Sequence, residues 1–329
     1  MAKWIDLNYR RARAKNSQQL LRAIGLRIWP LSQLVHRYHR SRMEPDRWAK
    51  INKTARDILE RQSWDFDDTQ RRALSDLRRD GLHITHLQEL LGPDANLREL
   101  IDEAQTLVNQ PEMQRQIETR RSSDGAKWYV VRAFGLKKPK LPVPRVFANL
   151  ALHDKILQVV NSYLGVSSRV KYLDLWYNLP ATEADPPIDS ERWHRDNEDT
   201  NLVKMFFYLS DVDDAAGPLH YIRGTQPGGQ FGSLFPNDPP TGSYPPDGAL
   251  EKQVPAEQTH RCVGGAGTLV LYDACGFHFG GRSTTKPRII LVVTYASDAA
   301  IDLRHYELKD HDQYETLSEP AKYAIRAPR

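Results

Sequence analysis

The sequence contains few cysteines and no long apolar run. Its 329 residues include 2 cysteines, Cys262 and Cys275, which do not form a CxxC pair. This number excludes a framework of several disulfides and favours a reducing, cytoplasmic setting. No stretch reaches the ~18 consecutive apolar residues of a membrane-spanning helix. The polar, basic start also lacks the apolar core and cleavage site of a secretory signal, so none is expected.

Positive charge is concentrated at the N-terminus. Residues 1–50 hold twelve Lys and Arg against three Asp and Glu, a balance of +9, whereas the whole chain carries +4 and residues 51–329 therefore carry −5. Within this arm, residues 17–42 show an amphipathic helical pattern, with a kink or restart expected at Pro30. The arm either packs on its own domain, which is the simpler interpretation, or residues 1–45 contact an anionic membrane peripherally.

Helical patterns precede a series of short strands. Helices are expected at 17–42, 47–62, 67–80 and 95–120, with a later one at 148–165 that ends at a glycine. From about residue 127 the pattern changes to strand-like runs. These runs lie at 126–134, 169–178, 201–210, 219–223, 267–273 and 288–296. This order predicts an α+β fold whose second half is an antiparallel barrel or sandwich.

One long connection interrupts the strands. Residues 227–255, "PGGQFGSLFPNDPPTGSYPPDGALEKQVP", contain seven prolines and five glycines. A loop of this length inside a compact domain is uncommon and often covers an active site. We expect either a lid or a surface insertion.

Two potential metal ligands stand in "ERWHRDNEDT" (191–200). In an extended segment, residues i and i+2 point to the same side, so His194 and Asp196 project together and Arg195 points away. With one more histidine, they would form the two-histidine, one-carboxylate triad that holds non-heme Fe(II) and leaves positions open. An HxD pair alone is a weak signal.

A third ligand is available in "CGFHFGGRSTTKPRIILVVTYA" (275–296). His278 follows a strong strand, and Arg288 opens the last apolar strand ten residues later. A buried guanidinium needs an anion, and its planar donors suit a carboxylate. Two histidines, an aspartate and a downstream arginine in this order are far more specific than any pair.

The runs "WHRD", "VKMFFYLSDVDDAAGPLHYIRGTQ" and "GFHFGGRSTTKPR" together resemble the phytanoyl-CoA dioxygenase family of Fe(II)/2-oxoglutarate-dependent oxygenases. "LRRDGLHI" (77–84) resembles the strand entry near the family's N-terminus, and the resemblance spans about residues 70–298. It implies a double-stranded β-helix, a cupin-like jelly-roll core with flanking helices. We therefore divide the chain into a basic helical extension (1–70), a dioxygenase domain (71–300) and a C-terminal tail (301–329).

The resemblance also implies a chemistry and its residues. Iron would be held by His194, Asp196 and His278, and 2-oxoglutarate by Arg288. With O2, such a site hydroxylates a substrate and releases succinate and CO2. Related halogenases have a small residue where Asp196 stands, so the carboxylate favours hydroxylation. The substrate implied is a small molecule or an acyl compound, which the sequence does not identify further.

Two positions depart from the family pattern. The turn that usually ends in Ser-His reads "RGTQ" (223–226), and Gly280 stands where some members have a hydroxyl residue. A second hydrogen bond to 2-oxoglutarate must therefore come from elsewhere. Strand parity and position suggest further candidates for the cosubstrate (Lys204, Asn178, Thr284) and for the substrate pocket (Trp176, Trp193, Phe206, Tyr208).

Three other interpretations remain at this point. A nucleic-acid-directed oxygenase would suit the basic arm, but the paired-arginine pattern of such enzymes is missing after His278, so nucleic acid is not the expected partner. A zinc hydrolase could use similar ligands but has no need for Arg288. A non-catalytic jelly-roll binding module would leave His194 and Asp196 as ordinary strand residues. The oligomeric state is not indicated by the sequence.

Overall fold

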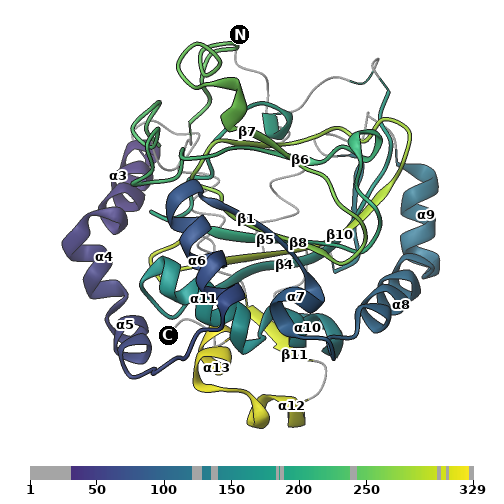
Figure 1. Ribbon diagram of the computed structural model, residues 1–329, viewed down its shortest axis with the longest axis horizontal. Helices are drawn as coiled ribbons and strands as arrows, with labels where there is room; N and C mark the ends of the chain where they lie inside the picture. The colour runs from purple at the N-terminus through teal and green to yellow at the C-terminus, as the bar shows by residue number, and fades with distance from the viewer. Residues whose placement is uncertain are drawn as a thin grey trace.

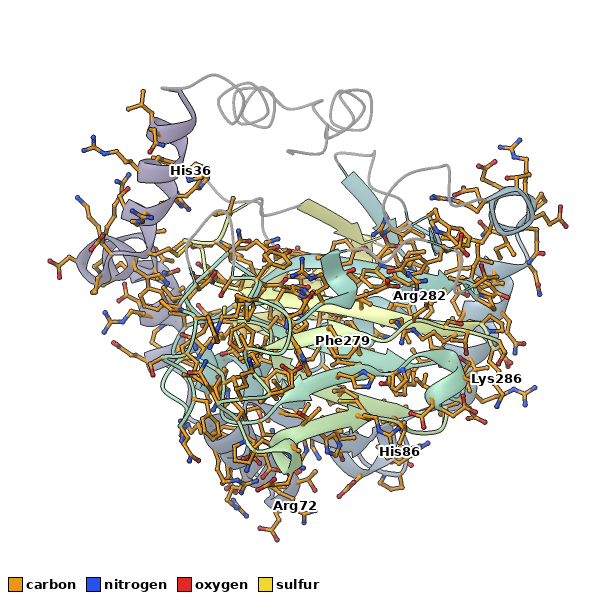
Figure 2. All side chains as sticks on the ribbon, turned by 90° about the horizontal axis from the view of Figure 1, so that it is seen from above. His36, Arg72, His86, Phe279, Arg282 and Lys286 are labelled. Atoms are coloured by element: carbon orange, nitrogen blue, oxygen red, sulfur yellow. The ribbon has the colours of Figure 1, made fainter. Side chains whose placement is uncertain are left out.

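The computed structural model describes residues 31–120, 128–134, 140–182, 185, 189–237, 243–301, 305–308 and 311–325 (Figure 1). The first part of the predicted basic helix, including Pro30, lies outside these residues. The second part is α3 (Leu31–Met43), on which Leu34 and Tyr38 are exposed. Figure 2 shows α3, where His36 is labelled, projecting from one side of the molecule.

Helices surround the sheets on several sides. After α3 they are α4 (Pro45–Ile51), α5 (Lys53–Glu60), α6 (Asp68–Asp80), α7 (Leu87–Leu91), α8 (Leu97–Val108), α9 (Pro111–Thr119), α10 (Arg145–Ala151), α11 (Asp154–Leu164), α12 (His311–Thr316) and α13 (Glu319–Ile325). Figure 1 shows α3 to α5 along one edge of the sheets and α8 with α9 along the opposite edge. Within the described residues, no helix is both long and apolar enough to cross a membrane.

Local sequence explains where these helices begin and end. Asp67 and Gln70 form a reciprocal capping box at the start of α6, and Gly81 ends that helix with φ 72°. Gly165 ends α11 in the same left-handed conformation, which confirms the expected stop. The single helix expected over 95–120 is wrong: it is divided into α8 and α9, because Pro111 lacks an amide hydrogen and starts a new helix instead.

Eleven strands form three sheets in the described residues. The strands are β1 (Leu82–His86), β2 (Val130–Arg132), β3 (Lys140–Val143), β4 (Arg169–Asn178), β5 (Val203–Tyr208), β6 (Leu219–Ile222), β7 (Thr259–Cys262), β8 (Thr268–Asp273), β9 (His278–Gly280), β10 (Arg288–Ala296) and β11 (His305–Leu308). The largest sheet has the order β1-β8-β5-β10-β4-β2 and is antiparallel throughout, and a smaller antiparallel sheet has the order β7-β6-β9. The pair β3 and β11 is parallel.

Strand alternation divides the core into two layers. Met205 and Phe207 on β5 belong to the cluster that packs the large sheet against α6, α7, α8, α10 and α11. Phe206 and Tyr208 point to the other face, where they pack with Leu219 and other residues of the small sheet. The two sheets therefore face each other across an apolar interior (Figure 1), and the expected mixture of helices with antiparallel sheets is confirmed.

Candidate metal centre

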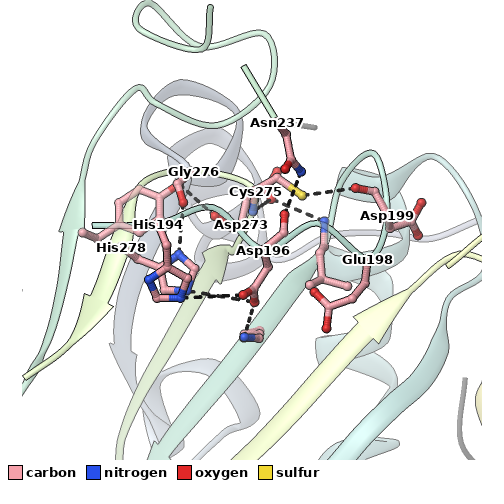
Figure 3. Close-up of polar contacts among 12 residues, drawn as sticks. His194, Asp196, Glu198, Asp199, Asn237, Asp273, Cys275, Gly276 and His278 are labelled. Carbon is pink, nitrogen blue, oxygen red and sulfur yellow. Dashed lines mark hydrogen bonds and ion pairs between the residues drawn. The ribbon is translucent and has the colours of Figure 1, made fainter. Parts of the chain in front are cut away.

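His194 and His278 come from segments that pair directly. They form an isolated antiparallel bridge with amide-to-carbonyl bonds of 3.1 Å in both directions. The amide of Asp196 donates to the carbonyl of Ala274 at 2.8 Å. Extended backbone at 194–196 projects His194 and Asp196 to one side, and β9 presents His278 at its first residue (Figure 3).

Hydrogen bonds orient both imidazoles toward Asp196. Nδ1 of His194 lies 2.8 Å from the carbonyl of Arg192, and Nδ1 of His278 lies 3.0 Å from the carbonyl of Gly276. Since a carbonyl only accepts, each Nδ1 carries the proton and each Nε2 offers its lone pair. Nε2 of His194 is 3.8 Å from Oδ1 of Asp196, and Nε2 of His278 is 4.0 Å from Oδ2. The three potential ligand atoms lie within 4.8 Å of one another, which fits one metal ion.

Burial keeps these groups in their ligating forms. The pKa of His278 is lowered well below its ordinary value, first by burial and then by the neighbouring His194. Burial alone would raise the pKa of the Asp196 carboxyl, but the Lys204 ammonium and the two imidazoles outweigh it and hold that pKa well below its usual range. At neutral pH the centre therefore contains a neutral His278 imidazole and a carboxylate.

Lys204 is the cation of this centre. It lies on β5, and its ammonium donates to Oδ2 of Asp196. The two side chains are only 21% and 16% exposed, so little water screens the pair. Burial alone would lower the pKa of Lys204, but Asp196 outweighs it and raises that pKa, together with Glu198, which accepts from Lys171 at 3.0 Å. Lys204 therefore pairs with Asp196, the only carboxylate among the three potential ligands.

Arg195, between the first two ligands, is buried rather than outward. Its guanidinium donates to four backbone carbonyls, those of Thr225, Cys275, Gly232 and Leu234. Its Cζ also lies 4.0 Å from the centre of the Phe277 ring. The expectation that Arg195 points away from the ligands is met, but the loop at 224–237 covers that side. Arg195 therefore ties three segments together directly behind the metal centre.

A pocket between the two sheets joins the metal centre to Arg288. Its lining residues are Tyr129, Val130, Trp176, Asn178, Ser190, His194, Asp196, Lys204, Phe206, Leu219, Tyr272, His278, Gly280, Gly281 and Arg288. Arg288 is 4% exposed, and its Nε is buried with no hydrogen-bond partner. Burial lowers the pKa of its guanidinium, and the described residues place no carboxylate against it. An unpaired buried guanidinium is a binding element for an anion.

The model of one family matches residues 43–290, well over half of the chain, and that family is phytanoyl-CoA dioxygenase (PhyH). The chain belongs to the phytanoyl-CoA dioxygenase family. No curated protein gives a significant match.

Several solved structures are similar to this family member. The epimerase SnoN, in complex with Fe3+, alpha ketoglutarate and nogalamycin RO, is 17% identical with a TM-score of 0.49, over 70% of this chain and 84% of that one. EctD from S. alaskensis, with 2-oxoglutarate and 5-hydroxyectoine, is 16% identical with a TM-score of 0.48, over 72% and 79%. AviO1 from Streptomyces viridochromogenes Tue57 is 18% identical with a TM-score of 0.44, over 73% and 99%.

The structure brings some of the expected pocket residues to the site and keeps others away. Trp176, Asn178 and Phe206 line the pocket. Trp193 does not, because neighbours in extended backbone point to opposite sides; its ring lies 4.5 Å from that of Phe279 and its Nε1 donates to Glu251.

Two further candidates also lie outside the pocket lining. Tyr208 is in the apolar interior, where its hydroxyl donates to the carbonyl of Cys262 at 2.5 Å. Thr284 is exposed on the loop between β9 and β10, and its hydroxyl donates to the carbonyl of Ala215 at 3.4 Å. Neither hydroxyl is therefore placed to hold a cosubstrate or substrate in the pocket.

Several lining residues were not anticipated, among them Tyr272, Tyr129 and Ser190. Tyr272 pairs in register with Lys204, and its ring lies 5.3 Å from that of His278. The alternation of "TLVLYD" could have placed Tyr272 on the inner face. Tyr129 directly precedes β2, within the run predicted at 126–134, and Ser190 lies in a short 3-10 turn at Asp189–Glu191. Burial raises the pKa of Tyr129 to about 12.

The proline-rich segment 227–255 is packed against the metal-binding segment. Asn237 donates to the carbonyl of Asp196 at 2.9 Å, and the amide of Arg195 donates to Ser243 at 3.1 Å. Tyr244, 46% exposed, stacks on the His194 ring with 5.7 Å between ring centres. Leu250 and Val254 are buried in a satellite cluster with Phe277 and others. Contacts from two parts of this segment therefore reach the backbone of residues 195–196.

Proposed function

We propose that this chain is an Fe(II)/2-oxoglutarate-dependent dioxygenase that hydroxylates a small-molecule or acyl substrate. The observation that carries the proposal is the placement of two unlike elements in one pocket. One is a triad whose two imidazole Nε2 atoms and one carboxylate are aimed at a common point. The other is Arg288, a buried guanidinium without an acidic partner. A hydrolytic metal site needs the first element but not the second.

His194, Asp196 and His278 would hold the iron, in a jelly-roll formed by the two facing sheets. Neutral imidazole and carboxylate donors in this ratio are those of the non-heme Fe(II) oxygenases. Lys204 engages Oδ2 of Asp196, which leaves Oδ1 to the ion and fixes the rotation of the carboxylate. Bound iron, with 2-oxoglutarate and O2, would supply the oxidation of a substrate C–H bond with release of succinate and CO2.

Arg288 would bind the distal carboxylate of 2-oxoglutarate. It opens β10 opposite Asn178 of β4, so both side chains enter the pocket from the same end of the large sheet. Asn178 is 2% exposed, and its Oδ1 has no hydrogen-bond partner. We therefore place the cosubstrate between this end of the sheet and the triad. Phe206 and Tyr272 wall the space and exclude water from it.

An anaerobic titration tests the proposal. Fe(II) and then 2-oxoglutarate are added to the protein, and the weak visible charge-transfer band of the chelate is followed. The wild type should develop the band at stoichiometric Fe(II), and Arg288→Met should weaken 2-oxoglutarate binding by about tenfold or more, because a charge-assisted pair is lost. Arg261→Met is the control, since Arg261 is exposed and pairs with Asp214. No band in the wild type would refute the proposed function.

A further inference from the structure

Arg132 is a further cation on the pocket side of the large sheet, in addition to Lys204 and Arg288. It ends β2, where it pairs with Trp176 while Val130 pairs with Asn178. Residues two apart on a strand share a face, and Val130 lines the pocket. Arg132 therefore lies on the same face as the pocket lining. Its Cζ is 5.4 Å from the centre of the Trp176 ring, which is itself part of the pocket wall.

This guanidinium has no polar partner in the part of the chain that the structure describes. Arg132 is half-buried, and its Nε is buried without a hydrogen bond. Among the described residues, its guanidinium contacts the Trp176 ring. Two other arginines with low exposure, Arg282 and Arg169, have acidic partners. Arg282 makes a two-point contact with Glu191, and Arg169 pairs with Asp298. A partly desolvated guanidinium without hydrogen bonds has spare capacity for an anion.

The two cations that line the pocket itself are already assigned. Lys204 is paired with Asp196. Arg288 would take the distal carboxylate of 2-oxoglutarate, whose other carboxylate would be bound near the triad. Arg132 is well separated from Arg288: β10, β4 and β2 are consecutive in the sheet, so the two backbones are about 10 Å apart laterally. A single molecule of 2-oxoglutarate therefore cannot contact the triad, Arg288 and Arg132 at the same time.

We propose that the substrate carries an anionic group, a carboxylate or a phosphate monoester, which Arg132 binds at the β2 edge of the pocket. Trp176 lies between this edge and the rest of the lining, so the part of the substrate next to the anion packs on its indole ring. The proposal rests on the proposed function and assigns a substrate class to that site. Arg132 is in this scheme a specificity-determining residue, and it takes no part in holding iron or cosubstrate.

Matched pairs of compounds test the charge requirement. Dodecanoate is compared with dodecanamide, 3-phenylpropanoate with its amide, and 3-phenylpropyl phosphate with the parent alcohol. Binding is measured by calorimetry on the anaerobic Fe(II)–2-oxoglutarate complex and on the metal-free protein. Succinate formation is followed in parallel. We expect an anionic member to bind about ten- to hundredfold more tightly than its neutral partner. The carboxylate and phosphate arms show which anion is preferred.

Variants then assign the preference to Arg132. Arg132→Gln should abolish the discrimination while 2-oxoglutarate affinity and melting temperature stay at wild-type values. Arg132→Lys should retain part of the discrimination, and Arg261→Gln should change nothing. The proposal is overturned if the wild type does not prefer anions, or if Arg132→Gln keeps the preference. It is also overturned if that variant loses 2-oxoglutarate affinity, because Arg132 would then bind the cosubstrate. Failure of the wild type to bind 2-oxoglutarate would instead refute the proposed function.

Discussion

Replacement of Lys204 by methionine separates the roles of this lysine in the metal-free and the metal-bound protein. The ammonium bonds to Asp196, and both side chains are largely buried. In the variant without metal, the carboxylate keeps its desolvation penalty and loses its strongest favourable partner. Breaking a buried pair by removing one member costs ~3–5 kcal/mol. Because about a sixth of the Asp196 side chain remains exposed, we expect a loss near the lower end of that range.

A divalent ion should reverse most of this loss, since it supplies positive charge to the same carboxylate. In the variant, the ion would also bind without the positively charged Lys204 ammonium beside it. The melting temperature of Lys204→Met should therefore fall by roughly 5–10 °C in chelator. The rise on addition of Mn²⁺ should then be larger than in the wild type. Differential scanning fluorimetry with EDTA or Mn²⁺ measures both quantities.

Lys171→Met is the matched control. Lys171 is also a nearly buried lysine on an inner strand, and it pairs with Glu198, which is not one of the triad. This variant should melt at a lower temperature in chelator but show the wild-type increment with Mn²⁺. An equal or smaller Mn²⁺ increment in Lys204→Met than in the wild type would refute the reasoning, because Lys204 would then not be coupled to the metal through Asp196.

Three further predictions concern stability. Arg195→Met should lower the free energy of unfolding by about 3 kcal/mol or more in urea titrations, because the carbonyls that Arg195 bonds lose their donor. The control Arg192→Met, at an exposed position, should change it by no more than about 0.5 kcal/mol. Equal effects of the two substitutions would contradict the structural role of Arg195. In chelator, the free energy of unfolding should fall as the pH drops below about 6.5, by up to ~1.4 kcal/mol per pH unit for His278. The reason is that His278 takes up a proton in the unfolded chain but stays neutral when buried in the folded protein. A free energy of unfolding that does not change between pH 7.5 and 5.5 would argue against a neutral imidazole. Gly276→Ala should destabilise the protein by thermal melting, because the added Cβ would lie 2.0 Å from Oη of Tyr221, and an unchanged melting temperature would show that the turn before β9 can shift freely.

Much of the site could be predicted from local sequence patterns. The strands predicted at 169–178 and 288–296 have the same bounds as β4 and β10. The second is an apolar run rich in β-branched residues, and the first alternates polar residues with leucines and aromatic residues. Period-two alternation correctly put His194 and Asp196 on one side of an extended segment. It also placed Trp176 and Phe206 on the pocket side of their strands. The choice of His278 depended on a strong strand before it and Arg288 after it.

What covers each face was decided only by the tertiary structure. Alternation turns Arg195 away from the ligands, but loop 224–237 covers that side. Arg195 is therefore buried and bonds to backbone carbonyls of the loop instead of facing solvent. Lys204 could have met a cosubstrate, and it meets Asp196 instead because the bridge between His194 and His278 lays that carboxylate over β5. That Arg132 meets no polar partner among the described residues likewise depends on which segments approach β2. Local periodicity determines the direction of a side chain, whereas its partner depends on segments far away in the sequence, whose positions are set by packing of the whole core.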